Sequence, residues 1–260
     1  MAEEHSYQLS LTEHDPLPGL ESFVPVRASK PPSTTTISFN DLLQPPLLLH
    51  ENLKQGCGGQ LWPAGMVLAR YMLHAHRHNI ADKTIIELGA GGGLVGLAVA
   101  RGSQITKPLI ITDQLPMLGL MQQNIALNSL ENRVIAGRLD WGTSISPSLE
   151  AHFSTHALLP DERFPDVVLA ADCVYFEPAF PLLLQTMHRL LGPETLCYFC
   201  FMKRRKADWR FIRDMKKQFE VVDAKYDDQH QDKRDGIYLY EVRRKPRSNA
   251  VQKELQRKTG

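Results

Sequence analysis

The sequence predicts an α/β protein with a mostly parallel sheet that is flanked by helices on both faces. Strand-like and helix-like segments alternate between residues 84 and 219, an order that is typical of a parallel sheet with helical crossovers. The strand-like segments are almost continuously apolar, as in Asp166 to Ala170 (DVVLA), which indicates burial on both faces of the sheet. The 260 residues are 43% hydrophobic and 23% charged, a composition that excludes a wholly disordered protein.

The first fifty residues are expected to form an N-terminal extension (residues 1–50) that is partly disordered. They include seven prolines, and proline disfavours helix interiors and central strands. Two short apolar pieces, Phe23-Val24 and Ile37-Ser38-Phe39, are compatible with edge strands laid on a core. Disorder is expected mainly in residues 1–20, because chain ends are commonly unstructured.

The alternating elements follow in order along the chain. Apolar residues recur at spacings of three and four from Pro63 to His78, and Pro63 suits a first helical turn, so a helix is expected there. The same reasoning predicts strands at 84–88, 109–112, 134–136, 166–170 and 196–202, and helices at 94–100, 116–128, 179–191 and 206–218. Two more strands, 220–222 and 237–242, are expected to pair antiparallel with no helix between them.

The strongest functional signal is the run Glu87 to Leu97 (ELGAGGGLVGL), which follows a strand and opens a helix. Glycines let the backbone pass close to a ligand, and a helix N-terminus presents free N–H groups. Gly91, Gly93 and Gly96 also satisfy the G-x-G-x-x-G fingerprint of dinucleotide sites. Taken alone, the run does not separate a nicotinamide cofactor from S-adenosylmethionine. The structural alternative is a strand–helix turn with glycines for packing.

Carboxylates follow the next strands, and the carboxyl ends of parallel strands form one ligand-binding edge. Asp113 ends the second strand, where a carboxylate can bind both ribose hydroxyls of either cofactor. Asp140-Trp141 follows the third strand, and a carboxylate beside an indole face suits an adenine ring. Asp172 and Tyr175 follow the fourth strand. The structural alternatives are helix caps for Asp113 and Asp172 and a turn with a core tryptophan for Trp141.

Taken in this order, the motifs resemble those of the seven-strand S-adenosylmethionine-dependent methyltransferases, and more narrowly the family-16 protein-lysine methyltransferases. The resemblance covers residues 50 to 243 and rests on Leu61-Trp62-Pro63-Ala64, Glu87 to Gly96, Thr112-Asp113 with the following Leu115-Pro116 and Asn124-Ile125, Trp141-Gly142, and Asp172-Cys173-Val174-Tyr175. It implies a Rossmann-like seven-stranded sheet, mostly parallel with an antiparallel last strand. It also implies one methyltransferase domain at residues 51–243, followed by a basic C-terminal tail at residues 244–260.

The resemblance further implies a site for S-adenosylmethionine and a pair of catalytic residues, with no metal. Asp172 would hold and orient a lysine amine, and Tyr175 would line its channel or hydrogen-bond within it. Glu87 would serve the amino group at the methionine end, and Gly92 departs from the family, which often has threonine there. The cofactor-binding residues that the resemblance implies are Trp62, Glu87, Gly89, Ala90, Gly91, Asp113, Trp141 and Ala171. Asp140 joins them as the carboxylate expected beside the adenine ring.

The nearest resemblance is to fungal enzymes that methylate a lysine of translation elongation factor 1-alpha, so a protein substrate of that kind is expected. A carboxylate suits an ammonium group, but a nearby carboxylate alone raises a lysine pKa. Burial and the positive sulfur of the cofactor must therefore favour the neutral amine. Two rivals from other classes stay open: an NAD-dependent oxidoreductase, and a catalytically silent module that keeps the cofactor fold and docks a partner.

Composition also predicts the setting in which the protein works. Four cysteines, a polar N-terminus and the lack of an apolar run of about 20 residues predict a cytoplasmic protein with no membrane contact, and nothing forces a dimer, so a monomer is expected. The net charge of +1 argues against general nucleic-acid binding, although Arg243 to Gly260 holds seven basic residues and could contact RNA. The basic run Lys203 to Lys206 either contacts the substrate or is solvated. Cys197 and Cys200 are expected to pack on opposite faces of a strand, and His74, His76 and His78 on a solvated helix end.

Overall fold

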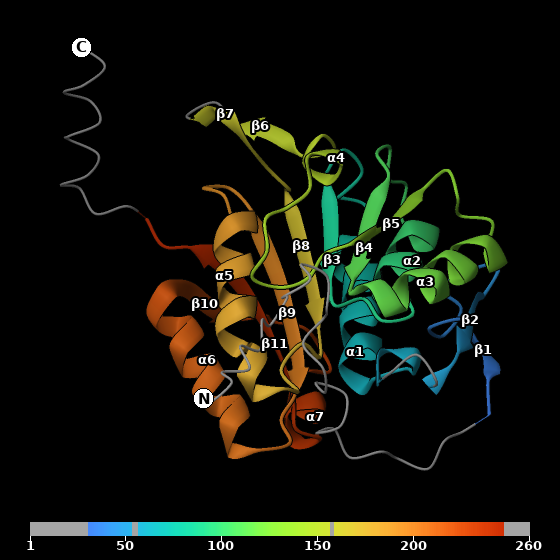
Figure 1. Ribbon diagram of the computed structural model, residues 1–260. Coiled ribbons are helices and arrows are strands. Elements are labelled where there is room, and N and C mark those ends of the chain that lie inside the picture. The colour runs from blue at the N-terminus through green and yellow to red at the C-terminus, as the bar shows by residue number, and fades with distance from the viewer. Residues whose placement is uncertain (1–30, 54–56, 157–158, 247–260) are drawn as a thin grey trace, which may run out of the picture.

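The computed structural model describes residues 31–53, 57–156 and 159–246. The strand expected at Phe23-Val24, the disorder expected in residues 1–20 and most of the basic tail lie outside these ranges. The described part has three layers, with a twisted sheet between two groups of helices (Figure 1). Within the described ranges, no helix is both long and apolar enough to cross a lipid bilayer.

The central sheet has seven strands in the order β10-β11-β9-β8-β3-β4-β5. Strands β5, β4, β3, β8 and β9 run parallel, whereas β11 is antiparallel to both β9 and β10. This confirms the predicted mostly parallel sheet with an antiparallel last strand. The strands are β3 (Ile85–Leu88), β4 (Leu109–Asp113), β5 (Val134–Arg138), β8 (Val167–Ala171), β9 (Leu196–Met202), β10 (Phe219–Asp223) and β11 (Ile237–Arg244).

Helices cover both faces of this sheet, and each face has its own apolar core. One core contains Leu68 of α1, Leu97 of α2 and Met121 of α3. The other contains Leu183 of α5 and Phe211 of α6. Cys200 belongs to the first core and Cys197 to the second, which confirms that they lie on opposite faces. The helices are α1 (Pro63–Tyr71), α2 (Leu94–Gly102), α3 (Leu115–Leu127), α5 (Phe180–Leu190) and α6 (Lys206–Gln218).

A two-stranded sheet before the central domain docks against α3. Its strands β1 (Ser33–Ile37) and β2 (Leu47–Glu51) pair antiparallel, and Leu47 and Leu49 are buried in the first core. The domain start expected at residue 51 therefore falls at the end of a strand that packs with the rest of the fold. The short helix η3 (Cys57–Gly59) then leads to α1.

Several elements differ from the sequence-based expectation. A short helix, α7 (Gln229–Arg234), lies between the last two strands, where no helix was expected. Between β5 and β8 the chain adds α4 (Pro147–Glu150) and a hairpin of β6 (Ser154–His156) and β7 (Leu159–Phe164), and η5 (Glu177–Ala179) precedes α5. Polar residues dominate most of these segments, so apolar patterning does not reveal them.

The helix expected from Pro63 to His78 ends differently as well. Regular α-helix stops at Tyr71 and a π-helical turn, η4 (Met72–His76), continues it. His76 is only half exposed, because its Nε2 lies 3.1 Å from the Tyr71 hydroxyl and its ring packs against Tyr198. The expectation that this histidine lies on a solvated helix end is therefore wrong, whereas His74 and His78 are exposed.

Candidate active site

The carboxyl ends of the parallel strands bring most of the expected site residues to one edge of the sheet. The chain leaves β3 toward β4 on one side, while β8 lies on the other side of β3. Such a reversal of strand order opens a crevice at the carboxyl edge, where open α/β sheets bind ligands. The loop between β3 and α2 (residues 89–93, the glycine loop) lies at this point (Figure 1).

The glycine loop owes its shape to residues that lack a side chain. Gly89 and Gly91 have φ angles of +61° and +54°, which favour glycine. A Cβ on Gly91 would lie 2.5 Å from the carbonyl oxygen of Gly58. A Cβ on Gly89 would lie 3.1 Å from both the Trp141 ring and the Cys173 sulfur. Trp141 therefore lies against the start of the loop.

Glu87 lies beneath the glycine loop and is almost completely buried. Its Oε2 accepts a hydrogen bond of 2.8 Å from the backbone N–H of Gly96, in the first turn of α2. Burial raises the pKa of this carboxyl to about 8, because the charged form loses its hydration. A cation brought next to it would reverse that effect, which suits the expected partnership with an ammonium group.

Asp113, at the end of β4, ties the glycine loop to the neighbouring strand. Its two oxygens each accept a backbone hydrogen bond of 2.7 Å, from Gly91 and from Gln114. Ala90 adds a backbone bond of 2.9 Å to the carbonyl of Thr112. Burial raises the pKa of Asp113, although these two N–H donors oppose the shift. Each carboxylate oxygen still has acceptor capacity for a hydroxyl group.

Asp140 lies at the rim of the site and already has a charged partner. Its Oδ2 accepts a hydrogen bond of 2.7 Å from Arg138 Nε, in an ion pair that is partly exposed. The neighbouring Trp141 is half-buried and packs against the second core. The indole of Trp141 lies next to Gly89 of the glycine loop.

Asp172 directly follows β8, after Ala171, and has the left-handed φ of +56° that side chains rarely adopt. Its side chain is buried and accepts hydrogen bonds from Met202 N at 3.1 Å and from both terminal nitrogens of Arg204. The next residue, Cys173, donates its thiol proton to the carbonyl of Leu88 at 3.3 Å, which joins this turn to the start of the glycine loop. Tyr175 is 39% exposed.

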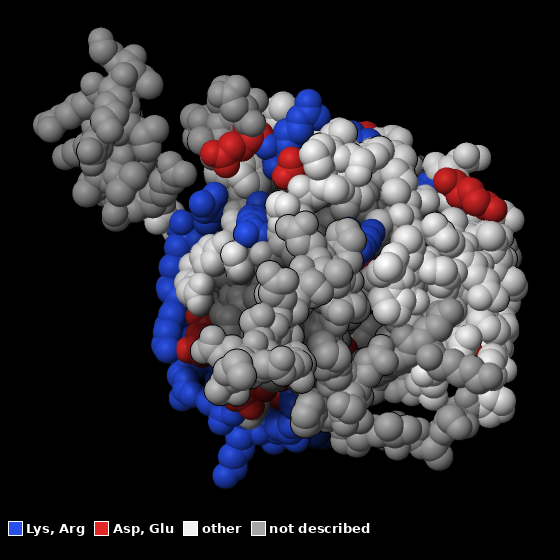
Figure 2. Space-filling view, in the orientation of Figure 1, with Lys and Arg blue, Asp and Glu red and all other residues white. Residues whose placement is uncertain are grey.

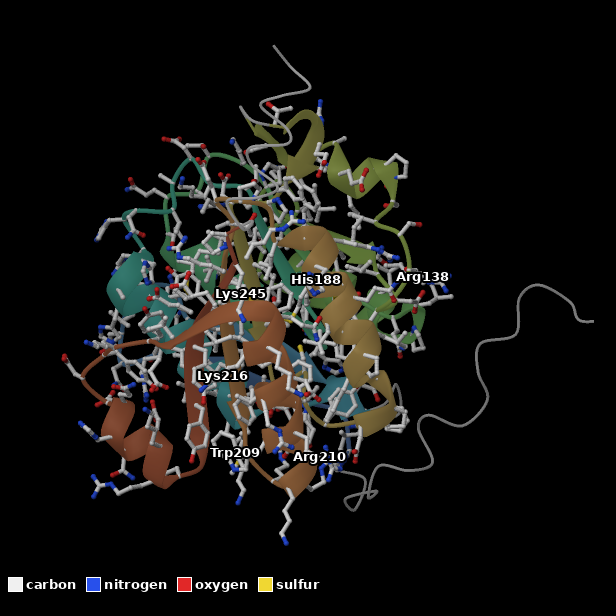
Figure 3. The ribbon with its side chains drawn as sticks, turned by 90° about the vertical axis from the view of Figure 1, so that its left-hand side faces the viewer. Arg138, His188, Trp209, Arg210, Lys216 and Lys245 are labelled. Carbon is white, nitrogen blue, oxygen red and sulfur yellow. The ribbon has the colours of Figure 1, made fainter. Side chains whose placement is uncertain are left out.

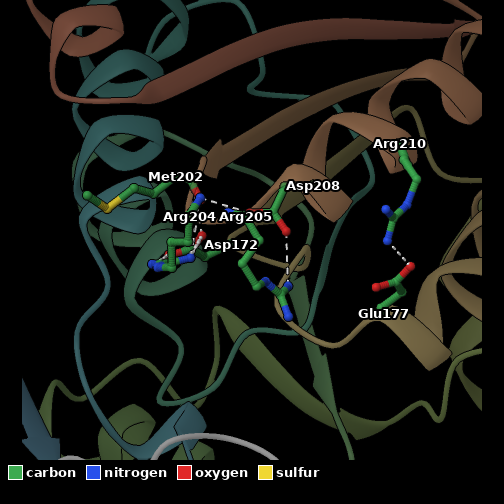
Figure 4. Close-up of polar contacts among 7 residues, drawn as sticks. All are labelled: Asp172, Glu177, Met202, Arg204, Arg205, Asp208 and Arg210. Carbon is green, nitrogen blue, oxygen red and sulfur yellow. Dashed lines mark hydrogen bonds and ion pairs between the residues drawn. The ribbon is translucent and has the colours of Figure 1, made fainter.

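Arg204 is a site residue whose role sequence reasoning missed. Its guanidinium carbon lies 5.0 Å from the centroid of the Trp62 ring, at the N-terminus of α1. It therefore links Trp62 to Asp172, and Figure 4 shows its contacts with Asp172 as dashed lines. The signal was available in the topology, because β8 and β9 are adjacent parallel strands and the residues after them meet at the same edge.

The rest of the basic run from Lys203 to Lys206 has other environments. Arg205 pairs with the buried Asp208, whereas Lys203 and Lys206 are exposed. Lys206 begins α6, along whose exposed surface Lys and Arg gather (Figure 2). The labelled Trp209, Arg210 and Lys216 lie along this helix in the view of Figure 3. Within the described ranges, no three His, Cys, Asp or Glu side chains gather in a metal-holding arrangement.

Comparison with known proteins identifies the family of this chain. A family model described as lysine methyltransferase matches residues 42–218. The chain belongs to this lysine methyltransferase family. It is 35% identical to the protein-lysine N-methyltransferase EFM6 of Saccharomyces cerevisiae, over 73% of this chain and 82% of that protein. It is 30% identical to the EEF1A lysine methyltransferase 3 of Xenopus tropicalis, over 75% and 79%, and 33% identical to the protein N-lysine methyltransferase METTL21A of Danio rerio, over 67% and 74%.

The methyltransferase uses S-adenosylmethionine, and its residues fit that cofactor. Gly89 leaves no room for a Cβ beside the Trp141 ring, Asp113 keeps acceptor capacity next to the glycine loop, and the Glu87 carboxyl lies at the first turn of α2. The cofactor supplies an electrophilic methyl group on a cationic sulfur. Family membership excludes the NAD-dependent oxidoreductase that the glycine run alone left open.

Proposed function

We propose that this lysine methyltransferase methylates a lysine of translation elongation factor 1-alpha. The observation that carries the proposal is the placement of Asp172: a buried carboxylate at the carboxyl edge, joined to the start of the glycine loop through the Cys173–Leu88 contact. A carboxylate there suits a basic amine better than it suits a neutral acceptor. The relative named as an EEF1A lysine methyltransferase, at 30% identity, supports the choice of substrate.

In this proposal the residues of the edge divide into two groups. Asp172 orients the acceptor amine, and Tyr175 lines the channel through which the lysine enters. The cofactor-binding residues are those expected from the sequence: Trp62, Glu87, Gly89, Ala90, Gly91, Asp113, Asp140, Trp141 and Ala171. The positions of Asp113 and Trp141 support this assignment, since both lie against the glycine loop, which itself supplies Gly89, Ala90 and Gly91.

The main work of such a site is alignment and exclusion of water. Holding the amine in line with the electrophilic carbon makes the encounter effectively unimolecular. Asp172 is suited to this task because its carboxylate is itself fixed by Met202 N and Arg204. The lysine must arrive as a neutral amine, because the protonated nitrogen has no lone pair to donate.

The proposal extends to the setting of the enzyme. We place it in the cytoplasm with the translation factor, acting as a monomer through a methyltransferase domain at residues 51–243 to which β1 and β2 are docked. The part of the basic tail after Lys245 is dispensable for cofactor binding, and RNA contact by it is not required. The silent-module alternative predicts partner docking without transfer.

A lysate experiment tests the proposal. Lysate from cells that lack this protein is incubated with the enzyme and S-adenosylmethionine that carries a labelled methyl group. One labelled band at the size of elongation factor 1-alpha, lost with Asp172→Ala, supports the proposal. A labelled band at the size of another protein overturns the proposed identity of the substrate. No labelled band under any condition favours the catalytically silent module.

A further inference from the structure

We propose that Arg204 is a positioning residue of the methyl-transfer site. Its positive charge balances the negative charge of the Asp172 carboxylate, so that Asp172 orients the acceptor lysine without holding it as an ammonium ion. The inference rests on the proposed function, because it needs an amine acceptor at Asp172. It also removes a difficulty in that function. An unpaired carboxylate stabilises the charged form of a nearby lysine, which is the form that cannot attack.

The contact between Arg204 and Asp172 is bidentate. Nη1 donates to Oδ1 at 2.9 Å and Nη2 donates to Oδ2 at 2.7 Å (Figure 4). The Asp172 side chain is only 5% exposed, and that of Arg204 is 31% exposed. A planar guanidinium matches a carboxylate in this geometry and remains charged at every physiological pH. Asp172 pulls the pKa of Arg204 higher still through this hydrogen bond.

The contact leaves part of the hydrogen-bonding capacity of Asp172 unused. A carboxylate has about four acceptor positions. Oδ1 uses two of them, for Met202 N and Arg204 Nη1, and Oδ2 uses one, for Arg204 Nη2. One acceptor position therefore remains, on Oδ2, which can take an N–H of a neutral lysine amine. The amine gives its extra proton to solvent water before it reaches this position.

The other ionisable groups around Asp172 leave the Arg204 charge dominant. Burial raises the pKa of the thiols of Cys173 and Cys200 well above the usual range, so both stay neutral. Asp208 lies close enough to raise the pKa of Arg204 but is already paired with Arg205. The carboxyls of Glu87 and Asp113, on the neighbouring strands β3 and β4, both have raised pKa values. Lys203 of the same turn is exposed, and Tyr175 follows Asp172 on its own loop.

The turn that carries Arg204 is held from its other side. The buried Oδ2 of Asp208 accepts hydrogen bonds of 2.8 Å from the backbone N–H groups of both Arg204 and Arg205. Arg205 adds an ion pair of 3.0 Å to Asp208 Oδ1. Because the backbone is fixed and the guanidinium also rests on the Trp62 ring, Arg204 is in place before a substrate arrives. The conformational entropy of the Arg204 side chain is therefore lost during folding and not during substrate binding.

The test is the pH dependence of single-turnover methyl transfer, with S-adenosylmethionine and recombinant elongation factor 1-alpha made in bacteria as the probe. In the bound complex, the acid limb of the rate profile reports the pKa of the group that must lose a proton. For Arg204→Gln and Arg204→Met we expect this limb to move to higher pH by about one unit or more, the size of shift that one close charge causes. Near neutral pH the rate then falls by about tenfold or more, and the loss shrinks as pH rises. Arg204→Lys, which keeps the charge, holds the limb close to the wild-type position.

Arg210→Gln is the matched control. Arg210 also pairs with a carboxylate, Glu177, on the same side of the molecule, but both side chains are about half exposed. The Arg210→Gln substitution removes the same charge from the protein, and we expect the acid limb of its rate profile to stay at the wild-type pH. The position of the limb does not depend on how much enzyme is folded, so partial misfolding of one variant does not obscure the result. Limbs that coincide for wild type, Arg204→Gln and Arg204→Met overturn the inference while leaving the proposed function intact. A wild-type enzyme that transfers no methyl group overturns both.

Discussion

The side-chain amide of Asn124 donates a hydrogen bond of 2.9 Å to the carbonyl oxygen of Gly92, in the glycine loop. The same side chain binds β2, where Oδ1 accepts from His50 N at 2.8 Å and Nδ2 donates to His50 O at 3.1 Å. One turn later, Asn128 makes the equivalent pair of bonds to Leu48. Asn124 of α3 and Asn128, the C-cap residue of that helix, thus bind β2 as a neighbouring strand would, and Asn124 also holds the glycine loop.

Replacing Asn124 should therefore weaken both the fold and the cofactor site. In Asn124→Ala the partly buried backbone groups of His50 and Gly92 lose their partner, and a fully buried group loses about 1–3 kcal/mol in this way. We expect the free energy of unfolding to fall by roughly 2–4 kcal/mol, measured by urea denaturation, and the affinity for S-adenosylmethionine to fall as well. Gln123→Ala, an exposed neighbour on the same helix, should leave both quantities nearly unchanged. Equal effects of the two substitutions would show that Asn124 does not hold the loop.

Gly89 should not tolerate even a methyl group. Its φ of +61° strains any other residue, and a Cβ would press on Trp141 and Cys173. Calorimetry should show that Gly89→Ala weakens S-adenosylmethionine binding by about tenfold or more, a loss of roughly 1.4 kcal/mol. Gly119→Ala is the matched control, because a Cβ at that position of α3 meets nothing within 4 Å. This control should bind the cofactor normally and gain up to about 1 kcal/mol of stability.

Glu87 should make the stability of the cofactor-free protein fall as pH rises. Its pKa in the fold is about 8, raised by burial from 4.5, so the folded state binds more protons than the unfolded state between these values. The stability that the protonated Glu87 carboxyl contributes is fully present below about pH 4.5 and is lost as pH rises toward and through about 8. Glu87→Gln keeps the shape without titrating, so its thermal stability relative to wild type should increase from pH 5 to pH 8, by an amount on the order of a few kcal/mol. Parallel curves of thermal stability against pH for wild type and Glu87→Gln would refute this prediction. Glu220→Gln, at an exposed position, serves as the control.

The buried parts of the fold were predictable because burial leaves a pattern. The strands β3, β4, β8 and β9 agree with their predicted ranges to within one or two residues, since strands covered on both faces must be continuously apolar. β1 was missed except at Ile37, because its threonines lie in the proline-rich extension for which partial disorder was expected, although β-branched residues favour strands. The helix α7 was missed because only its Asp232 is buried, where it pairs with Arg70 of α1.

The candidate site was predictable only as far as local motifs extend. Gly89, Asp113 and Asp172 follow strands directly, so topology alone assigns them to one edge. The contact between Asp172 and Arg204 spans 32 positions in sequence and depends on side-chain direction after β8 and β9. The sequence alone leaves open which member of the basic run reaches the carboxylate, because Lys203, Arg204 and Arg205 are all close to the end of β9.

The chain after Lys245 should be dispensable for cofactor binding. β11 ends at Arg244, and Lys245 caps α6 by donating to the carbonyls of Lys216 and Lys217 at 3.0 and 2.7 Å; Figure 3 labels Lys216 and Lys245. A protein that stops after Lys245 should bind S-adenosylmethionine as tightly as the full chain, measured by calorimetry. A protein that stops after Glu241 loses the buried Val242 and should unfold more easily. If the protein that stops after Lys245 lost cofactor binding, the tail would be part of the fold.

The most direct test of a lysine methyltransferase centred on Asp172 is intact-mass spectrometry of purified elongation factor 1-alpha. The factor is incubated with S-adenosylmethionine and either wild-type enzyme or Asp172→Asn, which keeps the shape of the side chain and removes its charge. Wild type should add one or more methyl groups to a single lysine, and Asp172→Asn should add none while still binding the cofactor in calorimetry. Methylation at the wild-type rate by Asp172→Asn, or none by the wild-type enzyme, would contradict the account.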